Sequence, residues 1–278
     1  MKELFEIEWF GGSAEKRFRK LRPDTAGLPW GTLDPKRYPP TLVDAARVAW
    51  TQIALNEYRA ATAFATLLKT MLEARVPLDI IGMASEFVAD ELSHAEMASR
   101  VVMELGGAVP IEVDTTDLLV RSDPDLTAIQ TANEQVLRVA VISETISSAI
   151  ATGTMRVARH PLLRAVEEII ARDEAHHMRL GTVYFEWAKE MFDDAERERL
   201  GLVALDTLER MSVLWKSRSD DAPAPEKFRL EDVQALWIDT TTFHARVSKA
   251  IKDDLMPTLR SIGLVLPERR ASTLLDSR

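Results

Sequence analysis

Apolar residues recur at spacings of three and four along most of the chain, and strand-like alternation is nearly absent. The pattern, read with the positions of Gly and Pro, predicts four long helices, which cover residues 41–73, 80–105, 133–158 and 161–191. Turns near Pro77 and Pro161 pair them into two helical hairpins, and residues 108–124 form a long crossover between the hairpins. The sequence therefore predicts an all-α four-helix bundle.

The segments outside the predicted bundle differ in character. Residues 1–40 are interrupted by Gly and Pro, which predicts an irregular N-terminal arm packed on the core. The expected anchors of this arm are the aromatic residues Trp9, Phe10 and Trp30. Residues 192–278 predict additional C-terminal helices, with a polar loop at 217–226 and an interruption near Pro257. We expect the arm, the bundle (41–191) and the C-terminal extension to form one domain.

Composition excludes several classes of protein. The 278 residues carry a formal net charge of −9, which argues against a general nucleic-acid binder, because phosphate affinity needs clustered Lys and Arg. The chain has no Cys, so any metal must be held by carboxylates and imidazoles, and a reducing, cytoplasmic setting is expected. No apolar run approaches the roughly 18 residues that a membrane span needs, and no membrane association is expected.

Two copies of one short motif suggest metal chemistry. The sequence reads Asp-Glu-x-x-His at 90–94, and again from Asp173 to His177. Residues three apart share one face of a helix, so Glu91 with His94, and Glu174 with His177, can each offer an oxygen and a nitrogen to a metal ion. A single Glu-x-x-His match is expected by chance, and the two copies therefore need partners.

The partners follow from the geometry of the hairpins. Residues equidistant from a hairpin turn lie level with each other, which places Glu57 opposite Glu91 and Glu144 opposite Glu174. All four carboxylates lie on apolar helix faces without Lys or Arg, where unpaired burial would cost many kcal/mol. Two divalent cations would balance the four negative charges. The predicted ligands, which would also be the catalytic residues, are Glu57, Glu91, His94, Glu144, Glu174 and His177.

The residues beside these ligands leave alternatives open. Asp90 and Asp173 are either solvated helix-surface acids or second partners that accept the other N–H of a ligand histidine. His176 points about 100° away from His177 and is expected to be structural. Glu167 is either solvated or close to the ligands. Without metal, the four facing carboxylates should all have raised pKa values.

This pattern resembles the ferritin-like di-iron carboxylate superfamily, in which two helices each supply a Glu and two supply a Glu-x-x-His. The resemblance covers about 41–191. It implies that Glu57, Glu91 and His94 serve one iron, that Glu144, Glu174 and His177 serve the other, and that Glu91 and Glu174 bridge the two ions.

Members of the superfamily differ at positions that can be checked. Ribonucleotide reductase small subunits carry a radical Tyr where this chain has Ala98, and arylamine N-oxygenases carry a further His where it has Ile170. Rubrerythrins add a Cys-rich iron domain, which this sequence lacks. Bacterial aldehyde-deformylating oxygenases and tRNA-hydroxylating di-iron enzymes share the six-ligand pattern, so they are the nearer analogies.

The resemblance implies a di-iron oxygenase that uses O₂ as co-substrate and an external electron donor to hydroxylate, N-oxygenate or cleave a small organic substrate. The sequence on both sides of the bundle favours this hypothesis, because additional helices commonly shape a pocket. The alternative is a ferroxidase or iron-handling protein, whereas a metal-free interaction module conflicts with the buried charge. The ligands suit Fe/Fe and Mn/Fe pairs alike. A homodimer is the expected assembly.

Overall fold

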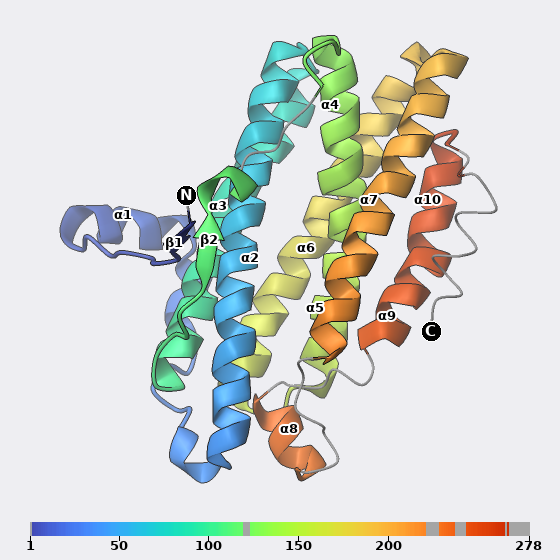
Figure 1. Cartoon of the computed structure of the whole chain (residues 1–278). Helices are drawn as coiled ribbons and strands as arrows, with labels where there is room; N and C mark the ends of the chain where they lie inside the picture. Colours follow the sequence, from blue (N-terminus) through green and yellow to red (C-terminus); the bar gives the residue numbers. More distant parts are fainter. Residues whose placement is uncertain (1, 119–122, 221–227, 237–242, 265, 267–278) are drawn as a thin grey trace.

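The computed structural model describes residues 2–118, 123–220, 228–236, 243–264 and 266, which are largely helical (Figure 1). The helices of the bundle are α2 (Pro40–Glu73), α3 (Leu78–Glu104), α4 (Ala128–Val136), the π-helical segment η4 (Leu137–Ser143), α5 (Glu144–Val157) and α6 (Pro161–Ala188). Helices α2 and α3 pack as one hairpin, and α5 and α6 pack as the other. The predicted all-α bundle is confirmed, including the long connection between its two hairpins.

The helix ends follow local sequence signals. Helices α2 and α6 begin with Pro40 and Pro161, whose missing N–H is not needed in a first turn. Thr127 and Gln130 form a reciprocal capping box at the start of α4. Helix α3 is followed by two Gly residues, Gly106 and Gly107, each at a φ of 107°, a conformation that favours glycine. These signals explain why the other predicted helices were close to the observed ones, whereas the third was predicted from 133 and begins at Ala128, directly after the Thr127 cap.

The core consists of two apolar clusters. One includes Phe64, Phe87 and Leu180, and extends to the C-terminal helices. The other includes Trp50 and Ile170 at the opposite end of the bundle. On α2, α3 and α6 the predicted ligands occupy positions between these clusters, whereas Glu144 lies between Ile142 and Ile146 of the first cluster. Apolar packing therefore lies on both sides of the polar residues at that level.

The third column of the bundle is not one regular α-helix. The π-helical segment η4 separates α4 from α5, and Glu144 is the first residue of α5. Gly181 of α6 lies against η4, since a Cβ at this position would come within 2.6 Å of Val141 Cγ2 and 3.0 Å of the Ala140 carbonyl oxygen. The absence of a side chain at 181 therefore allows α6 to approach the π segment.

Gly181→Ala should lower the free energy of unfolding by about 1–3 kcal/mol, because overpacking outweighs the better helix propensity of Ala. Gly82→Ala is the matched control, since a Cβ at this position of α3 meets nothing within 4 Å. It should stabilise the protein by about 0.5–1 kcal/mol. Urea denaturation of both variants measures the difference, and an unchanged or raised midpoint for Gly181→Ala would contradict the close approach.

The N-terminal arm contains more regular structure than predicted. Strand β1 (Lys2–Leu4) pairs antiparallel with β2 (Glu112–Asp114), which precedes the short helix η3 (Thr115–Leu118). Helix α1 (Gly12–Leu21) lies beside the bundle (Figure 1), and the short helices η1 (Pro23–Gly27) and η2 (Pro35–Arg37) lead to α2.

The predicted anchors of the arm were partly wrong. Phe10 is 96% exposed and Trp9 is 45% exposed, and the Trp9 ring packs edge-on against Phe18 of α1 and not against the bundle. Trp30 does contact the bundle, with the Arg100 guanidinium 3.7 Å from its ring centroid. Leu33 is the buried apolar residue of this region, and Phe5 packs edge-on against Tyr58. Aromatic character alone therefore did not identify which arm residues are buried.

The C-terminal extension is helical, as predicted. Its segments are η5 (Lys189–Met191), α7 (Asp194–Asp220), α8 (Leu230–Leu236), α9 (Phe243–Ala250), the π-helical segment η7 (Ile251–Leu255) and α10 (Met256–Ser261). The predicted loop at 217–226 begins later, since α7 continues to Asp220, and 221–227 lie outside the described residues. The predicted interruption near Pro257 corresponds to η7, which ends just before α10.

One helical stretch of the described chain, Ala128–Val157, is long and apolar enough to cross a membrane by length and composition. Half of its most apolar window is buried inside the protein. This stretch is the third column of the bundle and carries Glu134, Arg138 and Glu144. Its apolar character is explained by packing in the core.

Candidate metal centre

The six predicted ligands come together in the middle of the bundle. Helix α2 contributes Glu57, α5 contributes Glu144, and α3 and α6 each contribute one Glu-x-x-His pair. Their side chains form two groups, and within each group one ligand atom from every member lies within 4.8 Å of the others. The groups are Glu57, Glu91, His94 and Glu174, and Glu91, Glu144, Glu174 and His177. Glu91 and Glu174 are thus shared, as the resemblance implied for bridging ligands.

Both histidines turn the same ring nitrogen toward the carboxylates. His94 Nδ1 lies 3.6 Å from an oxygen of Glu57 and 3.6 Å from an oxygen of Glu91. His177 Nδ1 lies 3.1 Å from Glu91 Oε1 and 3.3 Å from Glu144 Oε2. Two nitrogens and four carboxylates therefore face a common interior, the donor set that suits iron or manganese.

Several atoms of this cluster are buried and have no hydrogen-bond partner among the residues that the structure describes. They are both carboxylate oxygens of Glu91, Nδ1 of His94 and Oε2 of Glu174. Buried polar atoms in folded proteins nearly always have partners, and each exception calls for an explanation such as an ion. Two bound cations would satisfy all four atoms, so the residues present fit a di-metal centre.

The charges of the metal-free cluster are distributed unevenly. Burial raises the pKa of Glu57 to about 7, and burial together with Glu144 and Glu91 raises the pKa of Glu174 well above its ordinary value. Burial acts against ionisation of Glu91 too, yet the imidazoles of His177 and His94 beside it lower its pKa to about 2.

The expectation that all four carboxylates have raised pKa values was therefore wrong for Glu91. Burial works against protonation of His177, but hydrogen bonds with Asp90 and Glu144 and the nearby Glu91 carboxylate raise its pKa to about 12. The His94 pKa is also raised, against the effect of burial, by Asp173, Glu57 and Glu91. Without metal, the protonated histidines thus supply positive charge beside the buried carboxylates. From the sequence, only metal ions were expected to supply it.

Asp90 and Asp173 pair with the ligand histidines crosswise. His94 Nε2 lies 3.1 Å from Asp173 Oδ2, and His177 Nε2 lies 3.3 Å from Asp90 Oδ2. Each aspartate therefore accepts from the histidine of the other motif, on the ring edge that faces away from the carboxylates. Of the two alternatives open for these residues, the geometry fits the second, in which they hold the histidine N–H.

Of two further residues close to the centre, Glu167 was left from the sequence as either solvated or near the ligands, and Arg22 was missed. Glu167 is buried in α6, where burial, followed by the charge of Glu57, raises its pKa to about 8. Its position seven residues before Glu174, on the same helix face, was a usable signal. Arg22 lies in the arm and forms ion pairs with both Asp90 and Asp173, for which no local signal exists.

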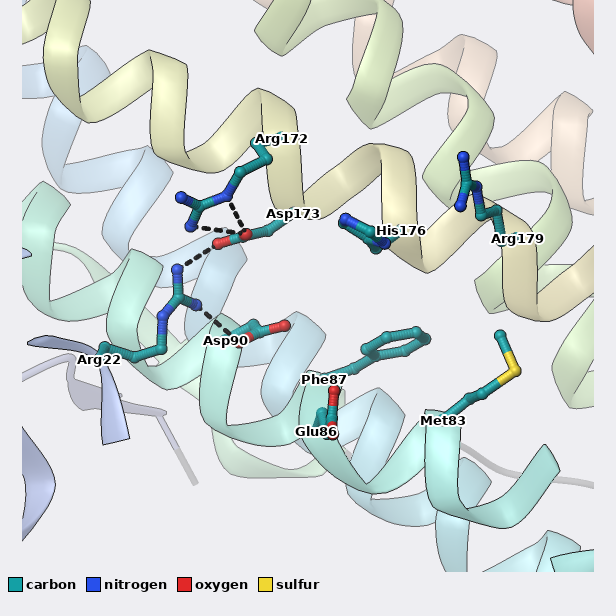
Figure 2. Close-up of a pocket in the computed structure, with 9 residues that line it drawn as sticks. All are labelled: Arg22, Met83, Glu86, Phe87, Asp90, Arg172, Asp173, His176 and Arg179. Atoms are coloured by element: carbon teal, nitrogen blue, oxygen red, sulfur yellow. Dashed lines mark hydrogen bonds and ion pairs between the residues drawn. The ribbon is translucent and has the colours of Figure 1, made fainter. Parts of the chain in front are cut away.

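A cavity of about 390 Å³ lies between α3 and α6, on the outer side of Asp90 and Asp173 (Figure 2). Its lining residues are Arg22, Met83, Glu86, Phe87, Asp90, Arg172, Asp173, His176 and Arg179. His176 is exposed here, so the sequence-based expectation of a structural role finds no buried contact. Most of the lining is charged, and the cavity therefore differs from the predominantly apolar pockets that usually hold small organic substrates.

Comparison with known proteins agrees with the fold. A solved structure, "Protein 19 with aldehyde deformylating oxidase activity from Synechococcus", matches with a TM-score of 0.56 over 84% of this chain and 95% of that chain. The sequences are 17% identical, a level at which the likeness shows the fold alone. No family model matches this sequence, and no curated protein matches it. The chain therefore has an all-α ferritin-like fold with a buried carboxylate and histidine cluster compatible with a di-iron site.

Proposed function

We propose that this protein is a non-haem di-iron oxidoreductase that uses O₂ to oxidise a small organic substrate. The observation that supports this most is the pair of ligand groups sharing Glu91 and Glu174, with buried oxygen and nitrogen atoms that lack partners. Two iron ions held there would supply the transfer of electrons between the substrate and O₂. A mixed Mn/Fe pair suits the same ligands.

The protein's own residues would set the geometry and charge of this centre. Glu91 and Glu174 belong to both groups, so they fix the separation of the two metal positions. Asp173 and Asp90 accept from Nε2 of His94 and His177, which keeps Nδ1 of each ring directed inward. The four carboxylates balance two divalent cations, leaving the histidines neutral when metal is bound.

Aromatic packing would exclude water from one side of the centre. The rings of Phe64 and Phe87 lie against the His177 imidazole, at centroid distances of 5.2 and 4.2 Å. Both phenylalanines are buried in the apolar cluster beside the ligands. A dry surrounding strengthens the electrostatic interactions of the site and limits side reactions of reactive species. We propose a cytoplasmic enzyme, in which an external donor supplies electrons.

Anaerobic loading with Fe(II) followed by exposure to O₂ tests this function. The substrate panel begins with aldehydes, because the structurally similar Synechococcus protein has aldehyde deformylating oxidase activity. O₂ consumption and product formation are measured with a chemical reductant present. Glu174→Gln should abolish both, whereas Glu168→Gln, an exposed position of the same helix paired with Arg164, should behave like wild type.

Product formation that depends on the organic compound supports the oxygenase. Catalytic Fe(II) oxidation with ferric mineral retained by the protein, and no organic product, would instead establish the alternative iron-handling function. If wild-type protein takes up no iron above the level of Glu174→Gln, both functions are contradicted.

A further inference from the structure

Arg22 lies outside the bundle helices but reaches two of them. It is the residue between α1 and η1, and its side chain is only 11% exposed. Its Nη1 donates to Asp90 Oδ1 on α3 at 2.6 Å, and its Nη2 donates to Asp173 Oδ2 on α6 at 2.5 Å (Figure 2). One guanidinium from the arm thus joins two carboxylates that lie on different helices of the bundle.

Each of these carboxylates is also the partner of one ligand histidine. The second oxygen of Asp90 lies next to His177 Nε2, and Asp173 Oδ2 lies next to His94 Nε2. Two series of contacts therefore run from guanidinium to carboxylate to imidazole, and both begin at Arg22. A change at this single residue would reach both histidines.

We propose that Arg22 is a positioning residue of the metal centre, which fixes the orientation of His94 and His177 together by holding Asp173 and Asp90. The N-terminal arm is then a structural part of the centre. This inference rests on the proposed metal-binding function for its consequence, but its geometry concerns residues that are present without metal.

The fork of an arginine suits this position better than a lysine. Two carboxylates from different helices need two N–H groups that point in fixed, separate directions, and a guanidinium supplies these from one rigid plane. A lysine ammonium at the same place is a single point of charge. Arg172 does not duplicate the arrangement, because it bonds Asp173 and Asp24 but has no bond to Asp90.

The contacts of Arg22 are not needed merely to hold the arm in place. Arg19 bonds Glu96 on α3, and the backbone N–H groups of Gly31 and Leu33 donate to Glu104 near the end of the same helix. These tethers hold both ends of the segment without touching the aspartates. They provide variants that separate attachment of the arm from orientation of the histidines.

Removal of Arg22 would expose the aspartates to water. Arg22 forms part of the wall of the 390 Å³ cavity, which also borders Asp90 and Asp173. Without the guanidinium, each carboxylate could rotate toward water in the cavity and weaken its bond to Nε2. The histidine would then gain rotational freedom, which lowers the affinity for metal.

The first test uses metal-free protein. The Nε2–H protons of both histidines are observed by NMR, with assignments from His94→Gln and His177→Gln. In Arg22→Met both signals should shift and exchange faster with water, whereas Arg19→Gln should leave them unchanged. If both signals keep their wild-type positions and exchange rates in folded Arg22→Met, the inference is wrong, whatever the protein does with metal.

The second test measures Fe(II) release to an excess of chelator under anaerobic conditions. Arg22→Met should release both ions about 10- to 100-fold faster, the loss usual for a partner that orients a ligand. Asp90→Asn and Asp173→Asn should each accelerate the release of mainly one of the two ions. Arg22→Lys keeps the positive charge and is the control for loss of the fold. It should still release both ions faster than wild type.

The outcomes separate the inference from the proposed function. Release at the wild-type rate from Arg22→Lys would show that charge alone is sufficient and would overturn the positioning role. Equal acceleration by Arg19→Gln and Arg22→Met would assign the effect to attachment of the arm. If the wild type binds no Fe(II) but the NMR signals respond to Arg22→Met, the proposed function fails and the positioning of the histidines stands.

Discussion

Replacing Glu91 or Glu174 by Ala should remove metal from both positions of the centre. Each of the two ligand groups contains both residues, so neither position keeps a complete set after one substitution. The loss of affinity should exceed the roughly 10- to 100-fold that follows removal of a residue behind a ligand. Glu57→Ala or Glu144→Ala should act mainly on one position, because each residue occurs in one group only.

Iron content per chain, measured after anaerobic loading and desalting, tests this expectation. Glu168→Ala is the control for a lost carboxylate on α6, since Glu168 is exposed and paired with Arg164. Glu91→Ala and Glu174→Ala should each retain only traces of iron. The iron content of Glu57→Ala and Glu144→Ala should lie between these traces and the wild-type content. Wild-type iron content in Glu91→Ala and Glu174→Ala would refute the shared-ligand centre.

The second large effect is expected in the metal-free protein, which should lose stability as the pH rises from about 5 to 8. Glu57 and Glu167 have an ordinary pKa of 4.5, and in the folded chain the pKa values are about 7 and about 8. Between the ordinary and the folded values, the unfolded chain gives up these protons first, so rising pH favours unfolding.

The other groups of the cluster do not reverse this trend. The raised pKa of His177, about 12 against 6.5, contributes stability that is complete below pH 6.5 and is lost progressively above it. The lowered pKa of Glu91, about 2 against 4.5, contributes stability that is lost only as the pH falls below 4.5. Bound metal favours the deprotonated ligands, so the loaded protein should diverge from the metal-free form over the same range.

Urea midpoints of both forms at several pH values measure the divergence. Glu167→Gln is the sharpest variant, because Gln cannot ionise and Glu167 belongs to neither ligand group. It should stabilise the metal-free protein by up to about 4 kcal/mol at pH 8 and have little effect near pH 4. Glu168→Gln is the exposed control. If Glu167→Gln has the same effect at every pH, the carboxyl is not a buried acid with a raised pKa.

Much of the fold and the six-residue cluster were predictable from sequence because they depend on regular geometry. Helical periodicity places Glu91 and His94 on one face, and the hairpin turn sets Glu57 level with them. These relations hold for any helical hairpin, whatever its surroundings. Four carboxylates on apolar helix faces need positive charge nearby. The carboxylate and imidazole side chains at these positions indicated that metal ions supply it.

The parts that sequence reasoning missed depend on long-range placement. Arg22 meets Asp173 across 151 positions of sequence, and the irregular segment that carries it has no period from which its direction could be calculated. Trp9 and Phe10 were expected to be buried because they are aromatic, but burial depends on what lies opposite. The cationic state of His177 without metal follows from Asp90, Glu144 and Glu91 together, which only the folded chain brings together.

The π-helical segment in front of Glu144 makes the centre sensitive to the local geometry of the third column of the bundle. A π turn accommodates one residue more than an α turn, and one residue corresponds to about 100° of rotation around the helix axis. If the same residues formed a regular α-helix, one flank would turn by this angle relative to the other, whereas deleting one residue between 137 and 143 would restore α geometry with both flanks in place.

In a regular α-helix of the same number of residues, either Glu144 would leave the bundle interior, or α4 would turn away from α7, where Asn133 bonds Glu196 and Glu134 pairs with Arg199. A substitution that converts the π turn to α geometry would keep all six ligand residue types, yet one carboxylate would no longer reach the others. A relative that retains every ligand residue can therefore differ in metal binding through the geometry of this one turn.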